Sequence, residues 1–156
     1  MNDHGGAPFA WADRVRVSRW RRRARLAWEV LRALPPMLWI EFSLRRSDLR
    51  VTCRRLGVRC DLTSSTAPSD EPPVLPRRTR APIRASYFVV SRWPAGDTCL
   101  RQCLLIGHRL RDLGPVLRIG VRRAEDGTFS AHSWLEIDSK ALDPAAAGYA
   151  VLGSAG

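Results

Sequence analysis

The sequence predicts an α+β fold in which a helical N-terminal part is followed by one helix and a small antiparallel sheet. Apolar residues recur at intervals of three and four along residues 14–34, which is the spacing of an amphipathic helix. Residues 61–82 are rich in Ser, Thr, Pro and charge. Beyond them, a helix-start signal precedes short segments typical of strands. We therefore expect a basic helical region at 1–60, a linker or exposed loop at 61–82, and a folded core at 83–156.

The composition suits one folded domain with a basic surface. The chain has 156 residues, 45% of them hydrophobic, which excludes a wholly disordered protein. The formal net charge is +11, and Lys140 is the only lysine. A GC-rich genome explains the preference for arginine but not the excess of positive charge. This charge would suit an acidic partner, whether peptide, nucleic acid or membrane surface, although no nucleic acid is expected.

The chain shows no targeting signal that we recognise. Its start, MNDHGGAPFA, lacks the basic and apolar regions of a secretory signal, and no apolar stretch has the length of a membrane span. The four cysteines (Cys53, Cys60, Cys99 and Cys103) are too scattered for a disulfide scaffold. We expect a cytoplasmic protein with reduced thiols.

Three helices are predicted in the N-terminal part. The first covers residues 14–34 and ends at Pro35-Pro36. A second spans Met37–Arg46, and a third begins at a Ser47-Asp48 cap and ends near Gly57. The first helix should bury one apolar face and expose its arginines; that face comprises Val17, Trp20, Ala24, Trp28, Leu31 and Leu34.

Two further helices are predicted after the polar segment. Residues 83–93 are ambiguous, because Tyr87-Phe88-Val89-Val90 favours a strand whereas Pro82 at a first helical position favours a helix, which we choose. Asp97 or Thr98 then caps a helix from Cys99 to about Leu113, ended by Gly114-Pro115. Its buried face comprises Leu100, Cys103, Ile106 or Gly107, Leu110 and Leu113.

Strands and turns alternate over the remaining residues. Val116–Arg122 is the first predicted strand, Asp126-Gly127 a turn, and Phe129–Ile137 the second strand. Asp138-Ser139 is a second turn candidate, which leads into a short strand at Ala141–Asp143.

Cys99 is the strongest candidate nucleophile among the cysteines. A cap at Asp97 or Thr98 places it in the first turn of its helix, where free backbone N–H groups and the helix dipole stabilise a thiolate. Cys103 lies one turn further along on the apolar face, as a small core residue. Cys53 and Cys60 flank an arginine-rich helix end and are expected to be structural.

His132 is the histidine that can serve as the general base. His4 lies in a start without predicted structure, and His108 is roughly 13 Å from Cys99 along the same helix. Strand pairing then selects the acid: a two-residue loop at Asp138-Ser139 makes His132 the diagonal neighbour of Asp143, about 7–8 Å away between backbones. Asp138 itself is roughly 20 Å from His132 along the strand. Cys99, His132 and Asp143 thus form the expected catalytic set.

Other interpretations of these residues remain open. A Cys, a His and an Asp occur in most chains, and a helix–strand–strand unit with a buried thiol and a structural histidine also accounts for them. The spacing Cys99-x3-Cys103 with His108 is unusual for zinc. No metal site and no cofactor are expected.

The run TCLRQCLLIGHRLRDLGPVLRIGV, a polar hairpin and AHSWLEID resemble the transglutaminase-like leader peptidases of lasso peptide biosynthesis, the catalytic part of the B protein. That family has Cys–Leu at a helix start, an iGV strand, an AHAW-type strand and an Asp on the next strand. The similarity runs from Pro94 to about Leu152. This chain departs from the pattern at Gln102 and Cys103, and in having Asp138-Ser139 where Asp-Gly is commoner.

The resemblance implies a transglutaminase-like (papain-like) fold and a thiol peptidase that removes the leader from a ribosomally made precursor. Cys99 corresponds to the nucleophile, His132 to the general base and Asp143 to its partner. A separate ATP-using cyclase then joins the freed amine to a side-chain carboxylate, and the leader typically has Thr as its penultimate residue. Trp93 could supply an indole N–H to an oxyanion hole, although a core position suits it better.

The resemblance also implies a separate partner. In this family a winged-helix domain recognises the leader, and residues 1–60 lack the strands that such a domain needs. We therefore expect a separate winged-helix recognition protein, and possible contact with the lasso cyclase. The arginine-rich helix at 14–34 could bind that protein, an acidic leader or an anionic membrane.

Two other functions compete with the peptidase. A basic module that binds nucleic acid or membrane, with structural Cys99 and His132, would bind in a steeply salt-dependent way and tolerate Cys99→Ala. No recognisable nucleic-acid-binding motif supports it. A silent relative that only scaffolds the cyclase would not need to retain Cys99, His132 and Asp143 together.

Overall fold

The computed structural model describes residues 10–64, 66, 69, 71–123 and 127–151, with side chains from residue 20 onward. The turn residue Asp126 and His4 lie outside this range. The helices are α1 (Ala10–Arg46), α2 (Leu49–Leu56), α3 (Arg80–Val90) and α4 (Cys99–Arg109), with 3-10 turns η1 (Arg77–Thr79), η2 (Arg111–Leu113) and η3 (Pro144–Gly148). The strands are β1 (Arg59–Cys60), β2 (Val116–Arg123), β3 (Phe129–Ile137), β4 (Lys140–Ala141) and β5 (Ala150–Val151). The predicted α+β fold class is confirmed.

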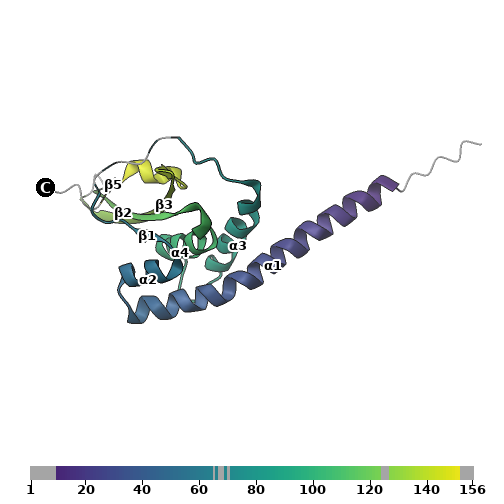
Figure 1. The fold of residues 1–156 in the computed structure, drawn as a ribbon, viewed down its shortest axis with the longest axis horizontal. Coiled ribbons are helices and arrows are strands. Elements are labelled where there is room, and N and C mark those ends of the chain that lie inside the picture. The colour runs from purple at the N-terminus through teal and green to yellow at the C-terminus, as the bar shows by residue number, and fades with distance from the viewer. Residues whose placement is uncertain (1–9, 65, 67–68, 70, 124–126, 152–156) are drawn as a thin grey trace, which may run out of the picture.

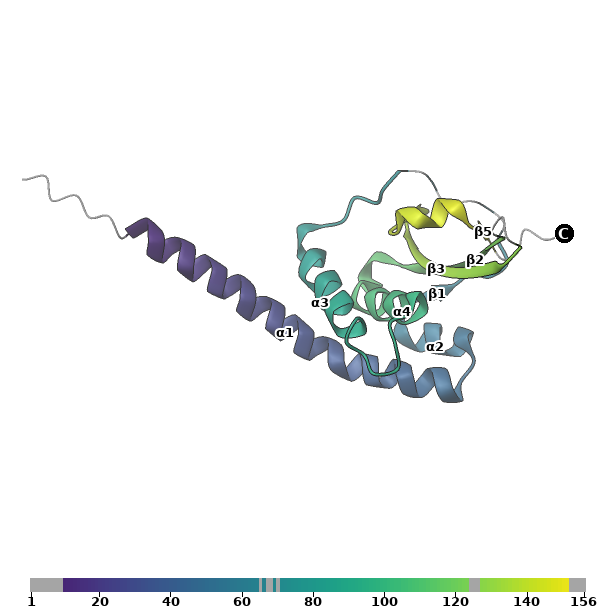
Figure 2. The same cartoon turned by 180° about the vertical axis from the view of Figure 1, so that it is seen from behind.

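The elements form layers around α4. One face of the sheet packs against α4, and α1 and α3 pack against α4 from its other side, while η3 lies over the opposite face of the sheet (Figures 1 and 2). The N-terminal half of α1 extends away from this body as an arm. The described helices include none with the length and apolar character needed to cross a bilayer.

The predicted break at Pro35-Pro36 is wrong, because α1 runs unbroken from Ala10 to Arg46. A proline inside a helix loses one backbone hydrogen bond and crowds the preceding turn, at a cost of about 3 kcal/mol. Packing on both sides of the prolines offsets that cost, since Ala33 and Met37 are completely buried against the other helices.

The predicted buried face of α1 is also wrong. Trp20, Trp28 and Leu31 are 71%, 59% and 59% exposed, whereas Ala33, Met37 and Ile40 are fully buried. The helix therefore has two apolar faces, and the core uses the one with Ala33, Met37 and Ile40, which lacks the bulky tryptophans of the other face. The exposed face continues through Leu38 and Phe42. The side chain of Val17 is outside the description.

The caps of α2 are confirmed. Asp48 accepts a hydrogen bond from the N–H of Arg50, and Gly57 ends the helix with φ 73°, a conformation that glycine adopts without strain. Residues 83–90 are helical as predicted, but α3 begins earlier, at Arg80, and ends at Val90, so residues 91–93 lie beyond it. The predicted helix from Cys99 to Leu113 is α4 followed by the 3-10 turn η2.

The sheet has the order β1-β2-β3-β4, with β5 also paired to β2. The two long strands match their predicted positions and pair antiparallel, with Gly120 opposite His132. Asp138 and Ser139 form the two-residue turn, with φ 52° and 61°, so that Glu136 pairs with Ala141. The predicted strand at Ala141–Asp143 is instead Lys140–Ala141, and Asp143 caps the start of η3.

The main hydrophobic core joins residues from both sides of the polar segment 61–82. Ala33 and Met37 of α1 and Cys53 of α2 pack in one cluster with Leu104 of α4 and Leu135 of β3. Part of the polar segment is tied to the sheet, because Arg118 of β2 donates hydrogen bonds to the carbonyl oxygens of Ser64 and Thr66. The helices and the sheet thus share one interior.

Candidate active site

Cys99 is the first residue of α4, and Thr98 is its cap. Thr98 is extended (φ −125°, ψ 144°), and its Oγ1 accepts a hydrogen bond from the N–H of Arg101 at 3.3 Å. Asp97, the alternative cap, instead accepts a hydrogen bond from Nε2 of Gln102 at 2.6 Å. Cys99 therefore lies in the first turn of α4, where backbone N–H groups without partners inside the helix can donate to an oxyanion.

His132 and Asp143 are joined by a hydrogen bond. Nε2 of His132 lies 2.7 Å from Oδ2 of Asp143. The other carboxylate oxygen of Asp143 accepts a hydrogen bond from the N–H of Ala145 at 2.9 Å, because Asp143 caps η3. Both oxygens of the carboxylate thus have a partner, and the carboxylate can fix the orientation of the imidazole.

Aromatic side chains hold the other sides of His132. Its ring stacks with Trp134 at 6.4 Å between centroids and meets Tyr149 at 5.0 Å in a tilted arrangement. Trp134 is fully buried, and its indole N–H donates to Glu136 at 3.0 Å. Since Nε2 is bonded to Asp143, Nδ1 is the ring nitrogen left to exchange a proton with a thiol.

One small cavity of about 40 Å³ is lined by all three predicted site residues, Cys99, His132 and Asp143. Among the hydrogen bonds of the described residues, none joins the Cys99 thiol to His132. Such contacts are often long before substrate binds. The structure therefore brings the three groups to one place and links two of them directly.

The remaining candidate residues lie in structural settings. Cys103 is buried and donates to the carbonyl oxygen of Ser133 at 3.3 Å, and burial raises the pKa of its thiol to about 12. Burial, together with the neighbouring Cys60, also raises the pKa of Cys53 to about 12. His108 contacts the carbonyl oxygen of Leu56 through Nδ1 at 3.1 Å, away from the cavity. These positions suit packing and not nucleophilic attack.

Tyr87 and Gln102 also line the cavity, and neither of them was expected at the site from the sequence. Tyr87 comes from α3, a helix that sequence periodicity alone could not connect to Cys99. Its pKa is raised, first by burial and then by the negative charge of Asp143. Trp93, considered as an oxyanion donor, is partly buried and packs against the core.

No group of three or more His, Cys, Asp or Glu side chains within the described part of the chain is arranged to hold a metal ion. The sequence model of the transglutaminase-like superfamily matches residues 43–153. The chain therefore belongs to the transglutaminase-like superfamily, and this membership supports a cysteine enzyme of the papain-like kind. Comparisons with curated proteins and with solved structures give no match.

Proposed function

We propose that this protein is a cysteine peptidase that removes the leader from a ribosomally made lasso precursor peptide. The hydrogen bond between His132 and Asp143, beside a cysteine at a helix start, is the observation that best supports a peptidase. Superfamily membership supports the same chemistry. The lasso substrate rests on the resemblance of the TCL, IGV and AHSW segments to the leader peptidases.

The proposed reaction is acyl transfer through a thioester. His132 takes the proton of Cys99 through Nδ1, and the thiolate attacks the carbonyl carbon at the junction of leader and core. The backbone N–H of Cys99 donates to the oxyanion. His132 then protonates the departing amine of the core, and the C–N bond breaks. Water, deprotonated by His132, hydrolyses the thioester and releases the leader as a carboxylic acid.

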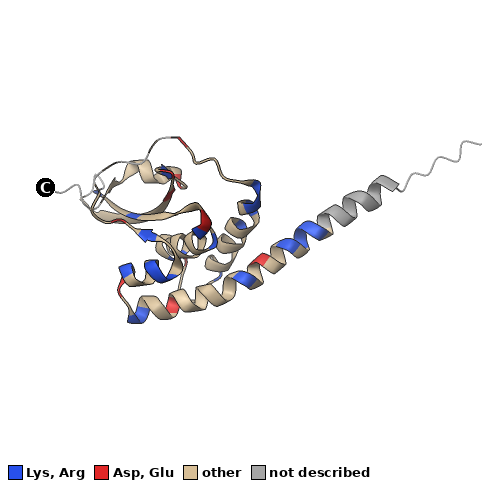
Figure 3. Ribbon diagram, in the orientation of Figure 1, with Lys and Arg blue, Asp and Glu red and all other residues tan. Residues whose placement is uncertain are grey.

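We further propose that a separate winged-helix leader-recognition protein binds the exposed apolar face of α1. This face presents Trp28, Leu31, Leu38 and Phe42, all more than half exposed. The two acidic residues of α1 whose side chains the structure describes are already paired, Glu29 with Arg109 and Glu41 with Arg101. The free charge of this part of the helix is therefore positive, since Figure 3 shows more Lys and Arg than Asp and Glu along its coloured part, and it favours an acidic partner surface.

The proposed peptidase activity is tested by measuring whether the mass of the precursor falls by the mass of the leader. The protein, its presumed recognition partner and the precursor encoded nearby are incubated, with Cys99→Ala and the control Asp138→Asn, at an exposed residue that lines neither cavity, in parallel. We expect the wild type and Asp138→Asn to release the leader, and Cys99→Ala to leave the precursor intact. If the precursor stays intact with the wild type and with both variants, all of them folded, the proposal is overturned. Salt-dependent binding that is indifferent to Cys99→Ala would then favour the basic binding module.

A further inference from the structure

A second and much larger cavity, of about 910 Å³, lies at the free edge of the sheet. Residues of α2, β1 and the start of the polar segment line it, together with one end of β2 and β3. Three of its lining residues are arginines with exposed side chains, Arg50, Arg54 and Arg59. It shares no lining residue with the cavity at Cys99.

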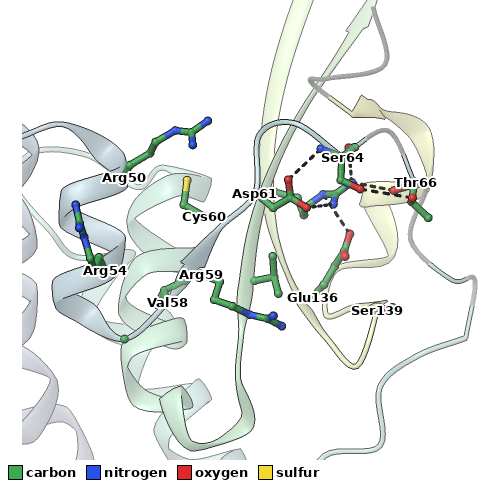
Figure 4. Close-up of a pocket in the computed structure, with 13 residues that line it drawn as sticks. Arg50, Arg54, Val58, Arg59, Cys60, Asp61, Ser64, Thr66, Glu136 and Ser139 are labelled. Atoms are coloured by element: carbon green, nitrogen blue, oxygen red, sulfur yellow. Dashed lines mark hydrogen bonds and ion pairs between the residues drawn. The ribbon is translucent and has the colours of Figure 1, made fainter.

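The free charge of this cavity is positive. Its two acidic residues, Asp61 and Glu136, both lie within ion-pair distance of the buried Arg118, at 2.8 and 3.8 Å. In contrast, no ion pair among the described residues involves Arg50, Arg54 or Arg59. Figure 4 shows Arg50 and Cys60 extending to one side of β1 and Arg59 to the other. Unpaired guanidinium groups therefore flank the strand on both sides.

The backbone at the centre of the cavity is an unpaired strand edge. β1 pairs in parallel with β2, and the N–H groups of Arg59 and Asp61 are bonded to the carbonyl oxygens of Pro115 and Leu117. Because backbone groups alternate in direction along a strand, the N–H and C=O of Cys60 point away from β2. An extended peptide can add to such an edge by main-chain hydrogen bonds.

We propose that this cavity binds an acidic, extended segment of the peptide substrate, which pairs with β1 while the carboxylates on one of its faces bond to Arg50 and Arg54, one turn apart on α2. A carboxylate matches the planar fork of a guanidinium, and a strand offers carboxylates at alternate residues. A nucleic acid would supply anions but no backbone that can extend a sheet.

The spacing of the two cavities fits one substrate. Glu136 lies four residues from His132 on β3, roughly 13 Å, and β1 lies two strands from β3, roughly 10 Å. The distance from His132 to β1 is thus roughly 16 Å, which about five extended residues span. A segment bound at β1 could hold the scissile bond of the same chain near Cys99. This part of the inference rests on the proposed peptidase function.

Binding is tested first with the full chain carrying Cys99→Ala, so that no cleavage intervenes. The probe is a fluorescein-labelled peptide, Thr-Glu-Val-Glu-Val-Glu, and the measurement is fluorescence anisotropy. We expect Arg50→Glu/Arg54→Glu to weaken binding at least tenfold. The matched control is Arg46→Glu/Arg55→Glu, which makes the same charge change on exposed arginines that do not line the cavity. An equal loss in both variants would overturn the site in favour of diffuse charge attraction.

Two further probes test the mode of binding. Two versions of the same peptide carry N-methyl groups, one on its odd-numbered amides and the other on its even-numbered amides. If the peptide pairs with β1, one of the two versions should lose binding. Unchanged affinity of both versions would overturn strand addition. A single-stranded oligonucleotide of six nucleotides should not compete with the peptide at equal concentration. Equal competition would overturn the acidic peptide and favour a nucleic acid.

Precursor processing separates this inference from the proposed function. With active protein, Arg50→Glu/Arg54→Glu should raise KM and leave kcat unchanged, while the control pair changes neither. If both double variants process the precursor with wild-type kinetics, the proposal that the substrate occupies this cavity is overturned. Peptide binding without any processing by the wild type would overturn the proposed function and, with it, the substrate assignment. If the wild type processes the precursor but does not bind the probe peptide, only the proposal that this cavity binds the substrate is overturned.

Discussion

The ring of Trp134 lies directly over Gly120, so that a Cβ added at position 120 would meet Cζ3 of Trp134 at 2.8 Å. The carbonyl oxygen of Ala150 would lie equally close, at 2.8 Å. Gly120 is also the strand partner of His132, which stacks with Trp134. The glycine of the IGV segment and the His and Trp of AHSW are therefore parts of one packed unit, and the glycine allows the ring to support the imidazole.

Gly120→Ala should disturb this unit. The added methyl group must displace the Trp134 ring or β5, and overpacking of this kind costs about 1–3 kcal/mol. We expect a lower Tm and a fall of at least tenfold in kcat for precursor cleavage, since the imidazole loses its support. Gly148→Ala is the control, because a Cβ there meets only a nitrogen of Arg122, at 3.7 Å. Equal activity in the two variants would contradict the role of the Trp134 contact.

Asp143→Asn should reduce cleavage while the protein stays folded. The amide keeps the shape of the carboxylate but cannot stabilise a protonated His132, and the equivalent change in a catalytic triad lowers kcat by roughly 10⁴. We expect a fall of between 10² and 10⁴, roughly, in single-turnover cleavage. Asp138→Asn is the matched control: Asp138 is exposed in the turn at φ 52°, which Asn tolerates. A similar loss in both would remove Asp143 from the proposed mechanism.

Local signals in the sequence predicted that Cys99, His132 and Asp143 lie close together, as they do around one cavity. The cap before Cys99 and the two-residue turn at Asp138-Ser139 each depend on a few neighbouring residues, and the turn alone sets which residue reaches His132. The hydrogen bond between His132 and Asp143 follows from that register. Tyr87 could not be found in this way, because its place beside Cys99 depends on how α3 packs against α4.

The errors in α1 have a different cause. Periodicity shows that a helix has an apolar face but not which face meets the core when there are two. The stripe with Trp28 and Leu31 is more hydrophobic than the one with Ala33 and Met37, yet the core takes the second. The strands β1 and β5 were not predicted either, because each has only two residues and depends on pairing with β2.

The two buried thiols should make stability fall in alkaline solution. The pKa values of Cys53 and Cys103 are raised to about 12, whereas the same thiols ionise near pH 8.5 in an unfolded chain. The contribution of the two thiols to the free energy of unfolding is complete below pH 8.5 and is lost as pH rises toward 12. The reason is that the unfolded chain releases these protons at lower pH than the folded protein does. The free energy of unfolding should fall by up to about 1.4 kcal/mol per pH unit for each thiol.

Urea unfolding between pH 8 and pH 10.5 measures this dependence. The double variant Cys53→Ala/Cys103→Ala should show a shallower slope than the wild type, whatever its stability at pH 8. Cys60→Ala, at a partly exposed position, should retain most of the slope. Parallel slopes in the wild type and the double variant would show that the thiols do not ionise differently on unfolding.

The ion pair between Glu29 of α1 and Arg109 of α4 should couple these two helices. Both side chains are nearly buried, 12% and 10% exposed, and burial lowers the pKa of Arg109 while Glu29 acts against that change. Glu29→Gln leaves a buried guanidinium without its counter-charge, so we expect a loss of about 3 kcal/mol in the free energy of unfolding. Glu29→Leu/Arg109→Met removes both charges and should be less destabilised than Glu29→Gln.

Urea unfolding measures the coupling between Glu29 and Arg109. It gives the free energy of unfolding of these variants and of Arg109→Met, with the exposed Arg111→Met as control. Strictly additive losses would show that Glu29 and Arg109 contribute independently, and α1 would then be held by its apolar contacts alone.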